Sequence, residues 1–203
     1  AQDGARGGAV TAEAAGGSAP LRGSAVVVPG YRGSEGQRIV QALVKRLEAA
    51  GIVARAATVM AGPRPSREYQ GEVAALRTAR DELRAAHAGP VALVGRSFGG
   101  RICAFLAAEE PPDALVVLGH PISPPGRPRP RDEGALASVR CPTLIVQGQR
   151  DELGPLAVLE RIAAANPLID IVVIPEAGHE LTSAQEREAV EHAGRWLEAR
   201  LLL

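Results

Sequence analysis

The sequence of 203 residues is poor in aromatic side chains, which make up only 2% of it, and Lys45 is its single lysine. Aliphatic residues and alanine must therefore fill the core, and a hydrophobic fraction of 46% is enough to form one. Lys+Arg and Asp+Glu both total 23, so charge of neither sign is in excess. Nucleic acids and anionic membrane surfaces attract basic proteins, and we therefore expect neither as a partner.

Cysteine is also scarce, since Cys103 and Cys141 are the only two and both lie in apolar segments outside any CxxC pattern. They form neither a disulfide framework nor a zinc site, and we expect buried free thiols. No apolar stretch approaches the length needed to cross a bilayer. The cytoplasm is the default expectation for the location, and the sequence makes no prediction of the oligomeric state.

The length fits one α/β domain. Residues 1–22 are rich in glycine and alanine and are expected to be a flexible segment with an edge-strand candidate at Ala9 to Ala14. Residues 23–203 are expected to form the domain. Within them, short apolar runs alternate with stretches whose apolar residues recur at helical spacing. This pattern predicts a doubly wound, mostly parallel sheet with helices on both faces.

The predicted elements alternate along the chain. Strands are predicted at Ala25 to Val28, Ile52 to Met60, Val91 to Val94, Ala114 to Leu118, Thr143 to Val146 and Ile169 to Ile174. Helices are predicted from Ser34 with a capping box to Gln37, over residues 73–83, from Phe98 to Ala108, near Leu156 to Ala165, and from Ser183 to the end. The proline-rich stretch from Pro121 to Pro130 is predicted to be a loop.

A glycine-rich motif, GRSFGG, follows the strand at Val91 to Val94 and precedes a helix. Gly95 and Gly99 lack side chains that would collide across a sharp turn, and Gly100 lets the helix pack close to the sheet. In a strand–turn–helix context, G-x-S-x-G is typical of a nucleophilic serine, which predicts that role for Ser97. A plain glycine turn is the alternative interpretation.

A serine hydroxyl needs a base to remove its proton, and the chain has four histidines. His179 follows the strand that ends at Ile174, and the chain order of such sites places the histidine last, so it is our first candidate. His120 also follows a strand and remains a second candidate. His87 and His192 fall at a helix end and on a solvated helix face.

An acid must hold the base in one tautomer. Asp151 follows the strand at Thr143 to Val146 and lies between Ser97 and His179 in the chain, so it is the predicted acid. Glu152 takes its place if the register shifts by one residue. The alternative for Asp151 is a turn residue or a helix cap.

Position also predicts the donors for an oxyanion. One is the backbone N–H of Phe98, directly after the serine, and the other is the N–H of Tyr31, in the loop after the first strand. Four residues are further candidates for the pocket, with surface packing as their alternative role: Gly30, Arg32, Tyr69 and His120.

The combined pattern resembles the α/β-hydrolase superfamily, and within it the small, lidless, dienelactone-hydrolase-like members, from about Ser24 to the C-terminus. The stretches that carry the resemblance are GRSFGGR (95–101), LGHPISPPGRP (118–128), CPTLIVQGQRD (141–151) and EAGHE (176–180). The resemblance implies Ser97 as nucleophile, Asp151 as acid and His179 as base, with the amides of Phe98 and Tyr31 as oxyanion donors. The chain departs from many relatives in having Pro29-Gly30 where they have His-Gly.

These residues predict a serine hydrolase that cleaves an ester, thioester or related acyl bond of a small molecule through an acyl-enzyme. No metal or organic cofactor is expected. Two alternatives stay open. The same triad can serve lyase, epoxide-opening or isomerase chemistry, or the fold can be a non-catalytic binding module in which Ser97 is vestigial.

Overall fold

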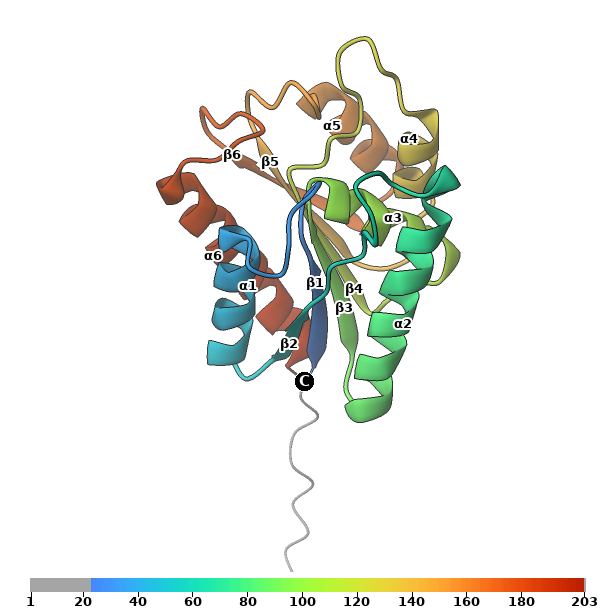
Figure 1. The fold of residues 1–203 in the computed structure, drawn as a ribbon. Helices are drawn as coiled ribbons and strands as arrows, with labels where there is room; N and C mark the ends of the chain where they lie inside the picture. The colour runs from blue at the N-terminus through green and yellow to red at the C-terminus, as the bar shows by residue number, and fades with distance from the viewer. Residues whose placement is uncertain (1–22, 203) are drawn as a thin grey trace, which may run out of the picture.

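The computed structural model describes residues 23–202, so the predicted flexible segment at 1–22 lies outside the described residues (Figure 1). Six strands form one wholly parallel sheet in the order β2-β1-β3-β4-β5-β6. The strands are β1 (Ser24–Val28), β2 (Val53–Ala56), β3 (Val91–Arg96), β4 (Ala114–Leu118), β5 (Thr143–Gly148) and β6 (Ile169–Ile174).

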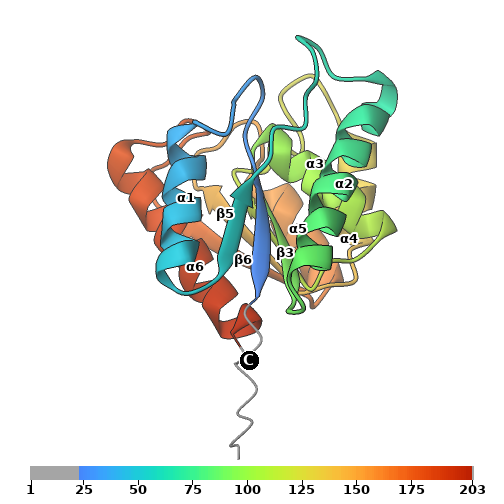
Figure 2. The same cartoon turned by 60° about the horizontal axis from the view of Figure 1, so that its bottom comes forward.

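Helices cover both faces of this sheet (Figure 2). They are α1 (Arg38–Ala49), α2 (Gln70–Ala86), α3 (Phe98–Glu109), α4 (Pro130–Ala137), α5 (Leu156–Ala165) and α6 (Ser183–Leu201). α1 and α6 pack on one face, and α2, α3, α4 and α5 pack on the other. The predicted doubly wound α/β class is confirmed.

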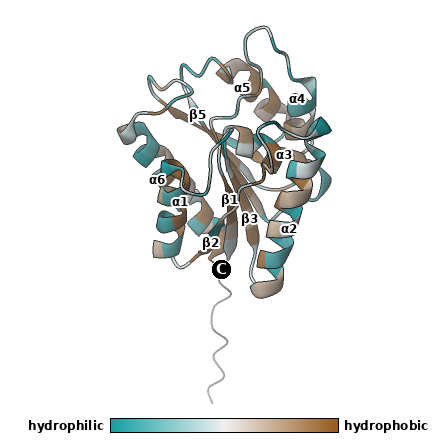
Figure 3. Ribbon diagram, in the orientation of Figure 1, coloured by the Kyte–Doolittle hydropathy of each residue, from teal (hydrophilic) through white to brown (hydrophobic). Residues whose placement is uncertain are grey.

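The core is divided in two by the sheet, because successive side chains of a strand point to opposite faces. In β1, Val26 and Val28 join the cluster under α2 and α3, whereas Ala25 and Val27 join the cluster under α1 and α6. Every residue of β1, β3, β4 and β5 is buried. This burial explains the unbroken apolar runs in the sequence, and Figure 3 shows hydrophobic strands flanked by helices that contain both hydrophilic and hydrophobic residues.

Two helices differ from the sequence prediction. α1 begins at Arg38 and not at Ser34, because the Ser34 hydroxyl accepts from the N–H of Gly36 in a turn and Gln37 turns its side chain to Gly30. The predicted capping box is therefore wrong. α4 was not predicted, because prolines precede it. Pro130 occupies the first turn of α4, where its missing N–H costs no helical hydrogen bond.

The edge strand β2 is shorter than predicted, since only Val53–Ala56 pairs with β1. β2 has a neighbour on one side only, and its side chains are half-buried or exposed. Residues 57–66 instead pass over the carboxyl edge of the sheet to α2. None of the helices within residues 23–202 combines the length and the hydropathy that a bilayer span requires.

The buried helix α3 should carry much of the stability. Leu106 is fully buried in α3, and we expect Leu106→Ala to lower the free energy of unfolding by about 2–5 kcal/mol, because it removes apolar contacts and leaves a cavity. Leu168 is 41% exposed and provides a matched control, for which Leu168→Ala should cost less than about 0.5 kcal/mol. Urea denaturation of both variants measures the difference, and equal costs would contradict the assignment of the core.

Candidate active site

The site lies at the carboxyl edge of the sheet, where the chain order reverses. From β1 the chain moves outward to β2, and it then returns to β3 on the other side of β1. In open parallel sheets such a reversal leaves a crevice between the loops of the two central strands. Ser97 follows β3 and Tyr31 follows β1, while Asp151 and His179 follow β5 and β6. The topology therefore brings these four residues to one edge.

Ser97 sits on a sharp turn between β3 and α3, with φ 51° and ψ −113°. A residue other than glycine is strained in this region, so the surrounding structure must hold it there. A Cβ on Gly95 would collide with the backbone of Gly100, and a Cβ on Gly99 would collide with the backbone of Pro29 and Val28. The turn is therefore too tight for side chains at Gly95 and Gly99, and it carries the hydroxyl side chain of Ser97.

The structure joins Ser97, His179 and Asp151 by hydrogen bonds. Ser97 Oγ lies 2.8 Å from His179 Nε2, and His179 Nδ1 lies 2.9 Å from Asp151 Oδ2 and 3.1 Å from Oδ1. The side chains of His179 and Asp151 are 10% and 1% exposed. The carboxylate accepts the Nδ1–H, which leaves Nε2 free to accept the serine proton. Glu152, the alternative acid, is exposed and has no hydrogen bond to His179 among the described residues.

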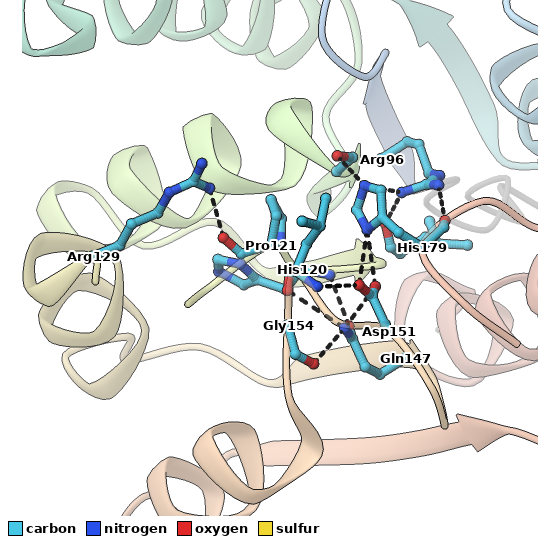
Figure 4. Close-up of polar contacts among 11 residues, drawn as sticks. Arg96, His120, Pro121, Arg129, Gln147, Asp151, Gly154 and His179 are labelled. Carbon is cyan, nitrogen blue, oxygen red and sulfur yellow. Dashed lines mark hydrogen bonds and ion pairs between the residues drawn. The ribbon is translucent and has the colours of Figure 1, made fainter. Parts of the chain in front are cut away.

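Gln147 holds the carboxylate of Asp151 from beneath (Figure 4). Its Nε2 donates to Asp151 Oδ2 at 2.9 Å and to the carbonyl of Gly154 at 2.9 Å, and its Oε1 accepts from the N–H of His120 at 2.8 Å. The N–H of Leu153 donates to the other carboxylate oxygen at 3.0 Å. The carboxylate plane is therefore fixed before it contacts His179.

Arg96 holds His179 from the opposite side. Its Nη2 donates to the backbone oxygen of His179 at 2.5 Å, and its Nη1 lies 3.5 Å from His179 Nε2. The side chain is buried, and burial lowers the pKa of its guanidinium, an effect opposed by nearby carboxylates, foremost that of Glu180. Figure 4 shows the His179 imidazole between Arg96 and Asp151.

The two residues predicted to supply the oxyanion amides, Phe98 and Tyr31, line the same cavity as Ser97. Within residues 23–202 the N–H groups of Phe98 and Tyr31 have no hydrogen-bond acceptor, whereas the N–H of Gly30 is occupied by Gln37 Oε1 at 2.9 Å. The rings of Tyr31 and Phe98 contact each other edge to face, with centroids 5.8 Å apart. The loop after β1 is thus held against the start of α3 and offers two free amides.

A cavity of about 660 Å³ opens in front of Ser97. Of the predicted pocket residues, Gly30 and Tyr69 line it, and so does Tyr31, a predicted oxyanion donor. Arg32 and His120 do not line this cavity. Arg32 is exposed and stacks on the outer side of Tyr31, and the loop after β4 folds the His120 ring into the protein interior.

His120 is a fully buried histidine without a role at Ser97. Neither ring nitrogen has a hydrogen-bond partner among the described residues, and burial lowers the pKa of the imidazole to about 4. Its backbone N–H, not its ring, contacts the site through Gln147. His87 and His192 lie on α2's end and on α6, away from the cavity lining.

Sequence reasoning missed Arg96 and Gln147. Arg96 occupies the variable position of G-x-S-x-G, and Gln147 is a lone amide at the end of an apolar strand. A polar residue inside a buried apolar strand needs hydrogen-bond partners, and this requirement could have marked both residues as part of a site.

No cluster of three histidine, cysteine or acidic side chains in residues 23–202 could hold a metal ion. Cys103 and Cys141 are free and buried, and burial raises the pKa of both thiols.

A sequence model of a family described as "Alpha/beta hydrolase domain" matches residues 55–200, well over half of the chain. The chain belongs to the alpha/beta hydrolase family. Membership supports hydrolase activity as a class and leaves the substrate open. A search of curated proteins found no match.

Solved structures of other alpha/beta hydrolases share this fold. A serine hydrolase homologue from Coxiella burnetii matches with a TM-score of 0.71 and 22% identity, over 86% of this chain and 85% of that one. The esterase domain of a Rhodothermus marinus protein matches with 0.68 and 19%, over 89% and 87%. A serine hydrolase without a lid from Xanthomonas campestris matches with 0.67 and 23%, over 89% and 85%.

The tight turn of this hydrolase chain should not tolerate a methyl group at residue 95. We expect Gly95→Ala to lower the free energy of unfolding by about 1–3 kcal/mol, because its Cβ meets backbone that cannot rotate away. Gly62 has open space around it, so Gly62→Ala is the matched control and should be near neutral. Thermal and urea unfolding measure both, and an unaffected Gly95→Ala would contradict the geometry of the turn.

Burial of His120 should make stability depend on pH. The folded pKa of about 4 lies below the usual 6.5, so between these values only the unfolded chain binds the proton and stability falls as the pH falls. Over that window the wild type should lose about 3 kcal/mol more than His120→Leu, which has no proton to bind there. Urea denaturation from pH 7 to 4 gives both profiles, and parallel profiles would contradict this expectation.

Proposed function

We propose that this chain is a serine hydrolase that cleaves an ester, thioester or related acyl bond of a small molecule. The proposal rests on the hydrogen bonds that connect Ser97 Oγ to His179 and His179 to Asp151. The N–H groups of Phe98 and Tyr31, which have no acceptor within residues 23–202, add to it. Two solved structures of the same fold are described as a serine hydrolase homologue and as an esterase domain, which adds support.

In the first half-reaction, Ser97 Oγ attacks the carbonyl carbon while His179 Nε2 takes the hydroxyl proton. Asp151 stabilises the imidazolium that forms. The carbonyl oxygen becomes an oxyanion and accepts hydrogen bonds from the N–H groups of Phe98 and Tyr31. The bond to the alcohol or thiol then breaks, His179 gives its proton to the leaving group, and the acyl group remains on Ser97.

In the second half-reaction, water attacks the acyl-enzyme. His179 takes a proton from the water, the bond between Ser97 Oγ and the acyl carbon breaks, and the proton returns to the serine. The products are a carboxylic acid and an alcohol or thiol, and each proton and electron pair in these steps is supplied by the residues, the substrate or water. A cavity of about 660 Å³ favours small acyl substrates of the kind that carboxylesterases and dienelactone-type hydrolases accept.

The proposal predicts a Ser97-dependent acyl-enzyme. Mixing the protein with 4-nitrophenyl acetate should release a burst of nitrophenol, and a fluorophosphonate probe should label Ser97. Ser97→Ala should abolish both, and Asp151→Asn should lower kcat by about 10⁴, because it allows the wrong histidine tautomer. Stopped-flow absorbance and mass spectrometry of the labelled protein provide the readouts.

Ser138 provides the matched control, because it is an exposed serine at the end of α4 and does not line the cavity. Ser138→Ala should retain both the burst and the label. A wild-type protein that shows no burst and no label, with intact folding, would overturn the proposal and favour a binding module. Turnover of a non-acyl substrate without any acyl-enzyme would favour lyase or isomerase chemistry.

A further inference from the structure

Arginine and glutamate side chains line the cavity in front of Ser97. Arg101, Arg127 and Arg129 line one wall and come from α3 and from the loop between β4 and α4. Glu180 and Glu186 line the other wall and come from the loop after β6 and from α6, and the buried Arg96 lies beside His179 on the same side. The whole chain is electrically balanced, whereas four arginines and two glutamates line the cavity, which therefore carries an excess of positive charge.

The basic wall holds positive charge without matching carboxylates. Arg101 is buried and forms an ion pair with Asp132, so its charge is balanced. Arg127 and Arg129 have no carboxylate within 4.0 Å among residues 23–202. Arg129 is half-buried, and its Nη1 donates a hydrogen bond to the backbone oxygen of Pro121 at 2.6 Å. Burial and the charge of Arg101 both lower the pKa of Arg129, and a bound anion would relieve this cost.

The wall with Glu180 and Glu186 is the side of the leaving group. His179 must hand its proton to the departing oxygen, which therefore lies on the His179 side of the serine. On that wall Glu186 is paired with Arg38 at 3.0 Å and Glu180 is exposed. Figure 4 shows Arg129 on the far side of Pro121 from His179. An acyl chain that points away from the leaving group extends towards the wall with Arg127 and Arg129.

We propose that the acyl group of the substrate carries a carboxylate, as in a monoester or monothioester of a dicarboxylic acid, and that Arg127 and Arg129 bind this carboxylate. The inference rests on the proposed function, because it places the acyl chain relative to Ser97. A guanidinium offers paired N–H donors that match a carboxylate, and a partly buried site strengthens such charged hydrogen bonds. Hydrolysis then releases a dicarboxylic acid.

The test compares two chromogenic esters of equal acyl length. 4-Nitrophenyl hydrogen adipate carries the carboxylate, and 4-nitrophenyl hexanoate does not. At an ionic strength of about 0.01 M, kcat/KM for the adipate should exceed that for the hexanoate by about tenfold, and the ratio should shrink at about 0.15 M as salt screens the charges. Arg129→Gln and Arg127→Gln should each lower the ratio several-fold, and Arg129→Lys should lower it less.

Arg140 provides the matched control, because it is exposed and precedes β5, at the opposite edge of the sheet from the cavity. Arg140→Gln should leave the ratio at the wild-type value. Arg127 is exposed and has no side-chain hydrogen bond within the described part of the chain, so its variant remains informative if Arg129→Gln unfolds.

The outcomes separate the two proposals. Ser97-dependent turnover of both esters without a preference for the adipate, or a preference unchanged in the Arg127 and Arg129 variants, overturns the carboxylate site and leaves the hydrolase proposal intact. Absence of turnover for both esters, together with no fluorophosphonate label on Ser97, overturns the hydrolase proposal and the inference that rests on it.

Discussion

The buried side-chain amide of Gln147 is the contact on which the geometry of the site depends. It connects the end of β5 to the loop after β4 through His120 and to the loop after β5 through Asp151 and Gly154. A buried amide that loses a partner costs the desolvation energy of that group, so each of these bonds constrains the others. The hydrogen bond from Gln147 fixes the orientation of the Asp151 carboxylate, and the carboxylate in turn fixes the orientation of the His179 imidazole.

The serine is positioned by an independent constraint. Its backbone is held in a strained conformation by close contacts of Gly95 and Gly99 with neighbouring backbone, none of which involves the histidine. Two separately fixed parts therefore meet at the hydrogen bond of 2.8 Å between Ser97 and His179. A site that is arranged before a ligand arrives needs little reorganisation during a reaction, which is the main source of electrostatic stabilisation in enzymes.

The sequence was informative wherever a local pattern and the topology specified the same place. Apolar runs located the strands, and the carboxyl ends of those strands then located Ser97, Asp151 and His179 at one edge. The structure brings these three side chains into contact, and their catalytic roles remain proposals.

Features that depend on loop packing could not be predicted. The partners of Gln147 come from two loops whose paths no periodicity describes, and the burial of the His120 ring depends on the same packing. The helix α4 was hidden because the prolines before it suppress a helical pattern, although Pro130 is compatible with a first turn.

The loop between β4 and α4 contributes side chains to the cavity but none of the groups that hydrogen-bond the serine, the imidazole or the carboxylate. It is anchored at His120, at Ser123, whose N–H donates to the backbone oxygen of Leu153 at 3.0 Å, and at Arg129, and Ile122 is buried in the core. The exposed stretch 125–128 can therefore diverge in descendants of this chain, with new side chains and new lengths, while the inherited proton-transfer apparatus stays as it is. Protein engineers who wish to change what this scaffold accepts would find in these residues the segment most easily exchanged.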